Sequence, residues 1–568
     1  MKSKWIAGIL TTMLLLCGIA VAIPVREQVE TGRAQTTHPM ELWTERISEE
    51  TNRRSITVRM DGSELSMEQP VILNETGAVF FPLSELKKAG NCYVGRFDDG
   101  RIVIEQGEDR LEILPDLQTV TKNGTTLELE ESIRQIEDEW YLPVSLLEDG
   151  LDYTVEWNVS KRELTLKKSA NAAELPVRYD YRQEGRAPLV GNQGSDDTCW
   201  AFASLKAVES TLLPERTMDF SKDHMNWNNS SGRAGEGGGS FWMALAYLTA
   251  WQGPVLEEQD PYGDGVSNAS LSAVMHVQEA QILPERDRQA IKKAVFQIGG
   301  VQSSLYLDPG AGNGASPYYR ADTAAYCYTG TEQSNHDIVI VGWDDAYSKE
   351  NFAEQPEGDG AFLCLNSWGT SFGENGYFYV SYYDAEIGIH NIVYSKIEEA
   401  QSNEVIHQTD LRGFTGQVGY GMDSASFANV YRAGATTELV NACGFYATGA
   451  DTSYRVFVTK GADTPEQFVM EHPVAEGTLP YAGYYTIPFT RQVQVESGES
   501  FAVIVEITTP GATQPVAVQA LTEDETRELV NSGGEQGYIS YRGYRWESAE
   551  AVSQARVCLK AYTKQKEE

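Results

Sequence analysis

The chain has 568 residues, of which 82 are Asp or Glu and 45 are Lys or Arg, so its formal net charge is −37. This length calls for several domains, and the acidic excess without a basic stripe argues against a nucleic-acid partner. Seven cysteines are too few for a scaffold held together by disulfides. We therefore expect a multidomain α+β protein.

The first 22 residues have the pattern of a secretory signal peptide. Lys2 and Lys4 precede an apolar stretch, which ends in the small residues Ala20 to Ala22, so we expect cleavage after this triplet. The apolar stretch is also long enough for an uncleaved membrane anchor. Residues 23–54 are polar and irregular and predict a linker. The protein is therefore expected to be secreted or extracellular, with association to the cell surface as one form of that location.

Residues 55–168 alternate short strands and turns and contain an internal repeat. The segment Val79–Leu86 echoes Trp140–Leu147, and each is followed by a glycine, a tyrosine-bearing strand, a polar turn and another strand. This pattern resembles the copper amine oxidase N-terminal-like domain, which implies a small α+β module. We see no cluster of His, Cys or Met that could hold copper. We therefore expect no cofactor here and favour a spacer or a surface-attachment module.

Cys199 opens an apolar run that predicts a helix, and Gln193 lies six residues before it. A thiol at a helix N-terminus lies beside unpaired N–H groups and the positive end of the helix dipole, both of which favour the thiolate. A side-chain amide held nearby can donate to an oxyanion. This short segment therefore predicts a nucleophile and an oxyanion donor together.

Two strand-like runs supply a candidate base and the residue that orients it. His336 directly precedes the run Asp337–Trp343, and Asn366 directly follows the run Ala361–Leu365. On neighbouring strands, the Asn366 amide can bond to the imidazole and fix its tilt and tautomer. Cys364, inside the second run, is expected to be a buried and unreactive thiol.

With these residues in this order, residues 175–398 resemble a papain-like cysteine peptidase, the family of papain and the cathepsins. The resemblance implies a helical subdomain, a β-barrel-like subdomain, and hydrolysis of peptide bonds in protein or peptide substrates without a cofactor. Further segments match the family in the right order: Asp180-Tyr181-Arg182, Phe220-Ser221-Lys222-Asp223, Gly238-Gly239-Ser240-Phe241-Trp242 and Gly373-Glu374-Asn375-Gly376-Tyr377.

The resemblance also implies substrate contacts. Gly238 and Gly239 match the segment that pairs with the substrate backbone, although loop flexibility alone could explain two glycines. Trp368 matches the residue that shields the His–Asn hydrogen bond from water. Asp337 stands where the family usually has a small residue that lines the second substrate pocket. Its carboxylate either favours a basic side chain two residues before the cut, or caps a strand and points away.

Two features depart from the family. Asp196 occupies the position of a disulfide-forming cysteine, so the usual bridge is missing, and Asp196 and Asp197 are candidate caps of the helix. No long propeptide-like helix precedes the peptidase segment, and we expect the stretch Ala170–Val177 to be a linker that is cut on maturation. The implied mechanism starts from a Cys199 thiolate paired with a His336 imidazolium.

Residues 403–564 are rich in strand-like segments, which predict a β-sandwich. Their position and pattern resemble the lectin-like domain that follows the peptidase in some secreted microbial members of the family. Cys443 and Cys558 either form a disulfide or remain two buried thiols. Three aromatic residues could stack on a sugar, or could equally be core or edge residues: Tyr541, Tyr544 and Trp546.

The alternative function is a non-catalytic adhesin. In that case the flanking modules would bind a cell surface or a glycan, and the peptidase fold would serve as a scaffold. The intact set of Gln193, Cys199, His336 and Asn366 argues against it.

Overall fold

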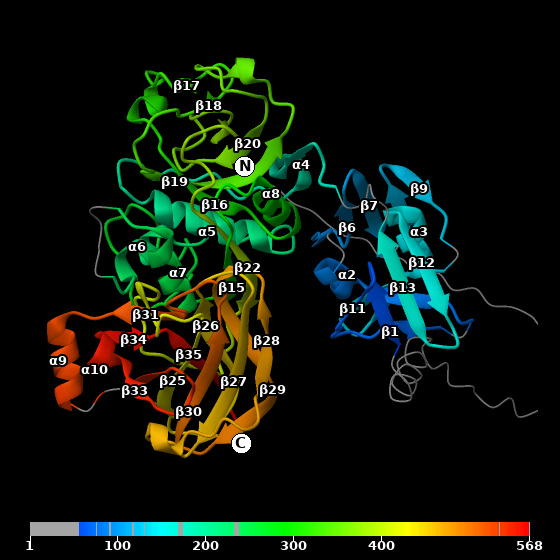
Figure 1. Ribbon diagram of the computed structural model, residues 1–568. Coiled ribbons are helices and arrows are strands. Elements are labelled where there is room, and N and C mark those ends of the chain that lie inside the picture. The colour runs from blue at the N-terminus through cyan, green and yellow to red at the C-terminus, as the bar shows by residue number, and fades with distance from the viewer. Residues whose placement is uncertain are drawn as a thin grey trace, which may run out of the picture. The chain divides into compact units, whose positions relative to one another are not determined.

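The computed structural model describes most of the chain after residue 55 (Figure 1). The predicted signal peptide (1–22) and linker (23–54) lie outside the described residues, as do Ala170 to Ala173 of the predicted cleavage segment. Within the described part, no helix is long and apolar enough to cross a membrane. The described ranges are 56–74, 76–89, 92–115, 119–129, 131–168, 174–231, 238–532, 534 and 536–566.

The two predicted repeats of the N-terminal module pair with each other. Strand β4 (Val79–Pro82) leads into α2 (Leu83–Ala89), and β11 (Glu139–Pro143) leads into α3 (Val144–Leu151). In the antiparallel pair β4–β11, Phe81 lies opposite Leu142, and both side chains are fully buried. The repeats therefore build one core. The other strands are β1 (Thr57–Met60), β2 (Ser63–Glu64), β3 (Ile72–Leu73), β5 (Tyr93–Arg96), β6 (Ile102–Gln106), β7 (Asp109–Leu114), β8 (Thr119–Lys122), β9 (Thr125–Leu127), β10 (Arg134–Ile136), β12 (Tyr153–Asn158) and β13 (Glu163–Lys168).

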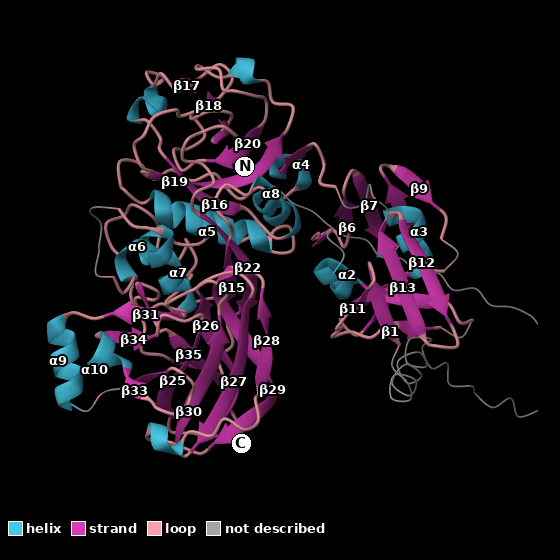
Figure 2. Cartoon of the chain, in the orientation of Figure 1, coloured by secondary structure: helices cyan, strands magenta, loops and turns pink. Residues whose placement is uncertain are grey.

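The helical part of the peptidase segment is built around α5 (Cys199–Leu212). Nearly all of its residues are buried, which is typical of a helix enclosed on every side. It packs on one side against other helices and on the other against strands (Figure 2). Its helical neighbours are α6 (Lys222–Asn228) and α7 (Phe241–Thr249), and the domain also contains α4 (Tyr181–Glu184) and α8 (Arg288–Gln297).

The two strands expected to carry the base and its partner are neighbours, as predicted. In the antiparallel pair β19 (His336–Asp344) and β20 (Ala361–Leu365), Val339 lies opposite Leu365. His336 begins the first strand and Asn366 directly follows the second, so both lie at one end of the pair. The sheet also contains β14 (Arg178–Asp180), β15 (Met275–Ile282), β16 (Val301–Leu305), β17 (Tyr319–Arg320), β18 (Ala325–Tyr326), β21 (Tyr377–Ser381) and β22 (Asn391–Glu399).

The C-terminal domain is a β-sandwich, as predicted. A six-stranded sheet, in the order β28-β27-β30-β25-β32-β33, faces the strands β29-β26-β35-β23 across a core that includes Phe427 and Phe445. The elements are β23 (Glu404–His407), β24 (Gly416–Val418), β25 (Ser424–Arg432), β26 (Glu438–Ala447), β27 (Thr452–Lys460), β28 (Ala475–Leu479), β29 (Ala482–Val495), β30 (Ser500–Thr508), β31 (Val516–Ala520), β32 (Gly537–Ser540), β33 (Glu547–Ser548), β34 (Ala555–Val557), β35 (Leu559–Gln565), α9 (Glu523–Ser532) and α10 (Ala549–Ser553).

One strand joins the sheets of the peptidase and C-terminal domains. On one side β15 pairs with β22, and on the other it pairs with β29, where Ala280 lies opposite Tyr484. The hydrogen-bonded sheet therefore continues from one domain into the next, which the sequence did not predict. Cys443 and Cys558 are both free and buried, so the structure has the two thiols rather than the disulfide.

A buried ion pair holds the start of the C-terminal domain. Lys560 on β35 donates to Asp410 at 2.8 Å and to Gln408 at 3.0 Å, and the charged pair is almost fully excluded from solvent. Burial raises the pKa of Asp410, and the Lys560 ammonium opposes this rise. A lone buried carboxylate costs more free energy than a buried pair.

We expect Lys560→Met to lower the free energy of unfolding by about 3–5 kcal/mol at neutral pH, because it leaves the Asp410 carboxylate without its cation. The double variant Lys560→Met/Asp410→Leu should recover most of this loss. Guanidinium titrations followed by circular dichroism measure both. A double variant as unstable as the single one would contradict this account.

Candidate active site

Cys199 is the first residue of α5 and is half-buried. The N-cap is Thr198, whose side chain makes no capping bond to the helix. Its hydroxyl instead lies 2.7 Å from the Tyr262 hydroxyl. The prediction that Asp196 or Asp197 caps this helix is therefore wrong, because the N-cap position falls on Thr198, after both residues.

The Cys199 sulfur lies beside the first residues of β19. The backbone N–H of Asp337 and that of Trp200 both donate toward the sulfur and favour the thiolate. Since Asp337 directly follows His336, this contact places the thiol beside the residue next to the predicted base. Burial outweighs these donors and, with the Asp337 carboxylate, raises the pKa of the thiol to about 12.

His336 and Asn366 form the predicted pair and are both buried. The imidazole Nε2 lies 2.7 Å from the Asn366 Oδ1. The same Oδ1 accepts the backbone N–H of Ser367 at 2.8 Å, so the amide oxygen faces the ring. Nε2 therefore carries the proton, and Nδ1 is left as the proton acceptor of the ring.

Burial also acts on the imidazole. It lowers the pKa of His336 to about 4, although the bond to Asn366 favours the protonated ring. Burial thus disfavours the charged form of both groups, whereas the ion pair predicted from the sequence needs both of them charged. That prediction counted the helix end and the imidazolium, but not the desolvation of both groups.

Gln193 is held in place by the segment that follows Asn366. Its amide oxygen accepts the Ser367 hydroxyl at 2.5 Å, and its backbone N–H donates to the Ser367 carbonyl at 2.8 Å. Its Nε2 donates to the carbonyl of Asp196 at 2.6 Å. An amide nitrogen has two protons, so the second remains to bind an oxyanion.

The predicted substrate-contact glycines lie next to the nucleophile. A side chain at Gly239 would collide with the Trp200 indole at 2.4 Å, and Gly238 has a φ of 67°. Both positions therefore require glycine for steric and conformational reasons. Trp368 lies over the base, with its ring centroid 5.2 Å from that of His336. This position suits the predicted shielding role.

Asp337 is buried and faces the neighbouring strand β16 rather than capping β19. Its two carboxylate oxygens accept the Ser304 hydroxyl at 2.7 Å and the Gln302 amide at 2.9 Å. Burial raises the pKa of Asp337, although these two bonds and the nearby His390 oppose part of the rise. His390 lies next to Phe241, the first residue of α7, with ring centroids 6.2 Å apart.

The residues that support these groups were not predicted from the sequence. Ser367 holds Gln193, the predicted oxyanion donor, and Gln302 and Ser304 hold Asp337. Ser367 stands between two predicted site residues, so its position was a usable signal. The β16 residues had no such signal, because their role depends on pairing with β19.

Three family models match successive parts of the chain. The copper amine oxidase N-terminal domain covers residues 59–166, the papain family cysteine protease covers 175–397, and the lectin-like domain covers 406–563. The chain therefore contains a papain-family cysteine peptidase domain followed by a lectin-like domain.

The N-terminal module, residues 55–168, has no histidine. In the described part of the chain, no group of three or more His, Cys, Asp or Glu residues is arranged to hold a metal ion, so copper does not fit here.

Among solved structures, the chain resembles the cysteine protease Cwp84 of Clostridium difficile. One structure, a clostridial Cwp84 variant after propeptide cleavage, is 25% identical, with a TM-score of 0.59 over 68% of this chain and 99% of that one. Another contains the cysteine protease and lectin-like domains of Cwp84, named as a surface layer associated protein. It is 25% identical, with a TM-score of 0.58 over 69% of this chain and 89% of that one.

Curated relatives match the peptidase part. Cysteine proteinase COT44 of Brassica napus is 29% identical over 38% of this chain and 63% of its own length. A cathepsin L-like peptidase of Aedes aegypti is 27% identical over 38% of this chain and 61% of its own length. The chain thus spans about three fifths of the length of these two relatives.

We expect His336 to titrate near pH 4 in the free protein, well below the ordinary imidazole value of about 6.5. A ring with a lowered pKa is neutral above about pH 4 and charges only as the pH falls through that value. NMR of the ring protons measures this. Asn366→Ala should titrate lower still, because it removes the acceptor that favours the charged ring. A value of 6.5 or higher would indicate an ion pair with Cys199.

Proposed function

We propose that the chain is a cysteine endopeptidase that cuts protein substrates through Cys199, His336, Asn366 and Gln193. The observation that carries this proposal is the convergence of a helix-terminal thiol, an oriented imidazole and a positioned amide at one end of the β19–β20 pair. The papain-family match over residues 175–397 supports the same chemistry.

The first half of the reaction forms an acyl-enzyme. As the Cys199 sulfur attacks the peptide carbonyl, Nδ1 of His336 takes the thiol proton. The free N–H of Gln193 and the Cys199 backbone N–H bind the carbonyl oxygen as it becomes an oxyanion. The imidazolium then gives its proton to the leaving amine, and the C–N bond breaks.

The second half releases the acyl group. His336 takes a proton from water, the hydroxide attacks the thioester carbonyl, and the C–S bond breaks as the sulfur regains the proton. Asn366 holds the ring through both steps, and Trp368 covers their hydrogen bond. Pairing of the substrate backbone with Gly238 and Gly239 places the scissile bond over the sulfur.

We place this activity outside the cell, either secreted or at the cell surface. The signal-peptide pattern of residues 1–22 supports this location. So does the likeness to Cwp84, which is described as surface layer associated. The flanking modules would then hold the enzyme near a cell-surface or glycan ligand.

Asp337 is proposed to select a basic side chain two residues before the cut. Its buried carboxylate is bound by two neutral donors, Ser304 and Gln302, and among the described side chains no Lys or Arg pairs with it. A guanidinium or ammonium of the substrate would supply the missing charge. Phe241, which lies next to His390, would offer an apolar wall for the aliphatic part of such a side chain.

We expect Cys199→Ala to abolish cleavage of a denatured protein substrate while leaving the thermal unfolding transition unchanged, because only the nucleophile is lost. Gln193→Ala should retain cleavage but lower kcat by about 10²–10³-fold through loss of one oxyanion donor. Cys443→Ala removes a buried thiol elsewhere and should stay active. Full activity of Cys199→Ala would overturn the proposal and favour the adhesin.

We expect Asp337→Asn to lower kcat/KM by about 10–150-fold for peptides with Arg two residues before the cut, equivalent to a charge-assisted bond of about 1.5–3 kcal/mol. Peptides with Leu at that position should change by less than about threefold. The control is Asp322→Asn, because Asp322 is exposed and accepts a bond from Arg320. An equal loss for both peptides would assign Asp337 a structural role.

A further inference from the structure

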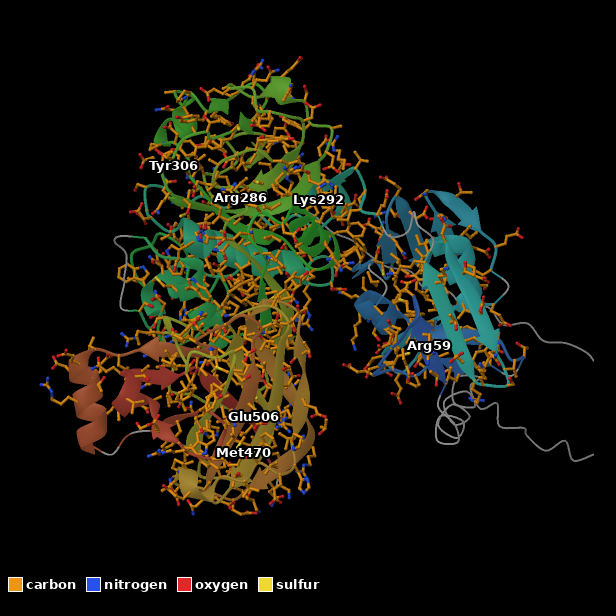
Figure 3. The ribbon with its side chains drawn as sticks, viewed as in Figure 1. Arg59, Arg286, Lys292, Tyr306, Met470 and Glu506 are labelled. Carbon is orange, nitrogen blue, oxygen red and sulfur yellow. The ribbon has the colours of Figure 1, made fainter. Side chains whose placement is uncertain are left out.

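The solvent face of the six-stranded sheet in the C-terminal domain carries an open pocket of about 530 Å³. This volume is within the range of about 300–1,000 Å³ that is typical of small-molecule sites. Strands β25, β27 and β30 form its floor, and residues 541–544 form a wall. Glu506 on this floor is labelled in Figure 3.

The floor consists of two rows of polar side chains that cross the three strands. In one row Thr508 lies between Ser424 and Ser453, and in the next Glu506 lies between Ser426 and Arg455. Glu506 and Arg455 form an ion pair. Alternation along the strands places all six side chains on the same face of the sheet. The floor thus offers a flat array of hydroxyl, carboxylate and guanidinium groups.

The row of side chains next to this floor is covered by the protein itself. The next row, Ala428, Ile504 and Phe457, is buried in a small cluster under Phe468 and Trp546. Trp546 is therefore packed against the protein and not free to stack on a ligand. The two polar rows lie beside this cover, and all six of their side chains line the pocket.

Two tyrosines form the wall. Tyr544 is 92% exposed and Tyr541 38%, and both line the pocket. The turn that carries them is held in shape, because Gly543 adopts a φ of 73° and its N–H donates to Ser540 at 3.0 Å. A side chain at Gly543 would press against Met470 at 3.0 Å. A preformed turn presents an aromatic face at little entropic cost.

The pocket is locally basic in a chain whose net charge is −37. Its lining contains two arginines and one glutamate. Glu506 pairs with Arg455, whereas within the described residues no carboxylate lies at ion-pair distance from Arg542. The Arg542 guanidinium lies 4.9 Å from the centroid of the Tyr541 ring and donates to its hydroxyl at 3.3 Å. This unpaired cation favours a ligand with a negative charge.

We propose that this pocket binds a saccharide that carries a carboxylate or phosphate group. The edges of a sugar ring present hydroxyls to the polar floor, and its apolar C–H face stacks on Tyr544. The acidic group pairs with Arg542. An extended peptide would need a free sheet edge, whereas this pocket opens on a face. A nucleic acid would need a wider basic surface.

The test uses the full-length chain on an array of saccharides that includes uronates, sialosides, phosphorylated mannosides and their neutral counterparts. Acidic members should be retained and neutral ones should not, and retention should fall as NaCl is raised. The affinity for the best acidic member is then measured by titration calorimetry. Retention of neutral saccharides alone, or of none, would overturn the proposal.

Substitutions then locate the binding site. Tyr544→Ala and Arg542→Gln should each weaken binding of that saccharide by about tenfold or more. Arg545→Gln makes the same charge change on an exposed neighbour outside the pocket lining, and Tyr383→Ala removes an exposed tyrosine of the peptidase domain. Both should bind normally. If Arg545→Gln and Tyr383→Ala weakened binding as much as Arg542→Gln and Tyr544→Ala do, the saccharide would bind elsewhere. Peptide hydrolysis is a separate readout, so this proposal and the peptidase proposal can fail independently.

Discussion

The short segment that follows β20 determines the geometry of the active site. Asn366 orients the imidazole, and the next residue, Ser367, binds Gln193 through both its hydroxyl and its carbonyl. The backbone N–H of Asn366 in turn donates to the Gly376 carbonyl at 2.9 Å. This segment therefore sets both the tautomer of the proposed base and the position of the proposed oxyanion donor. A shift of this segment would disturb both groups at once.

The burial that fixes this geometry also opposes charge. It raises the pKa of Cys199 and lowers that of His336, so it disfavours the charged form of both groups. Asp337 adds a negative charge close to the sulfur and disfavours the thiolate further. A cationic substrate side chain paired with Asp337 would cancel this repulsion. In this arrangement the residue proposed to select the substrate would also ease ionisation of the nucleophile once that substrate is bound.

The site was predictable from the sequence where each residue stands in a local pattern. Cys199 begins a helix, and His336 and Asn366 stand at the ends of apolar runs, so short windows were sufficient. The pKa shifts of Cys199 and His336 were not predictable, because desolvation depends on packing from distant segments. The exposures of Tyr544 and Trp546 differ for the same reason: Phe468, far away in the sequence, covers only Trp546. The continuation of the sheet through β15 and β29 also depends on long-range pairing.

The continuous sheet holds the peptidase and C-terminal domains together. Because β15 is bonded to β22 on one side and β29 on the other, separating the domains would expose a row of backbone groups that now pair. Gln408, which accepts a bond from Lys560, donates to the Ala250 carbonyl at 3.0 Å and adds a second attachment between the domains. When the C-terminal domain binds a ligand, the peptidase domain would therefore be held near that ligand through a hydrogen-bonded sheet and not through a flexible linker. Binding to a charged saccharide would thus raise the local concentration of the cleft at the surface that carries it.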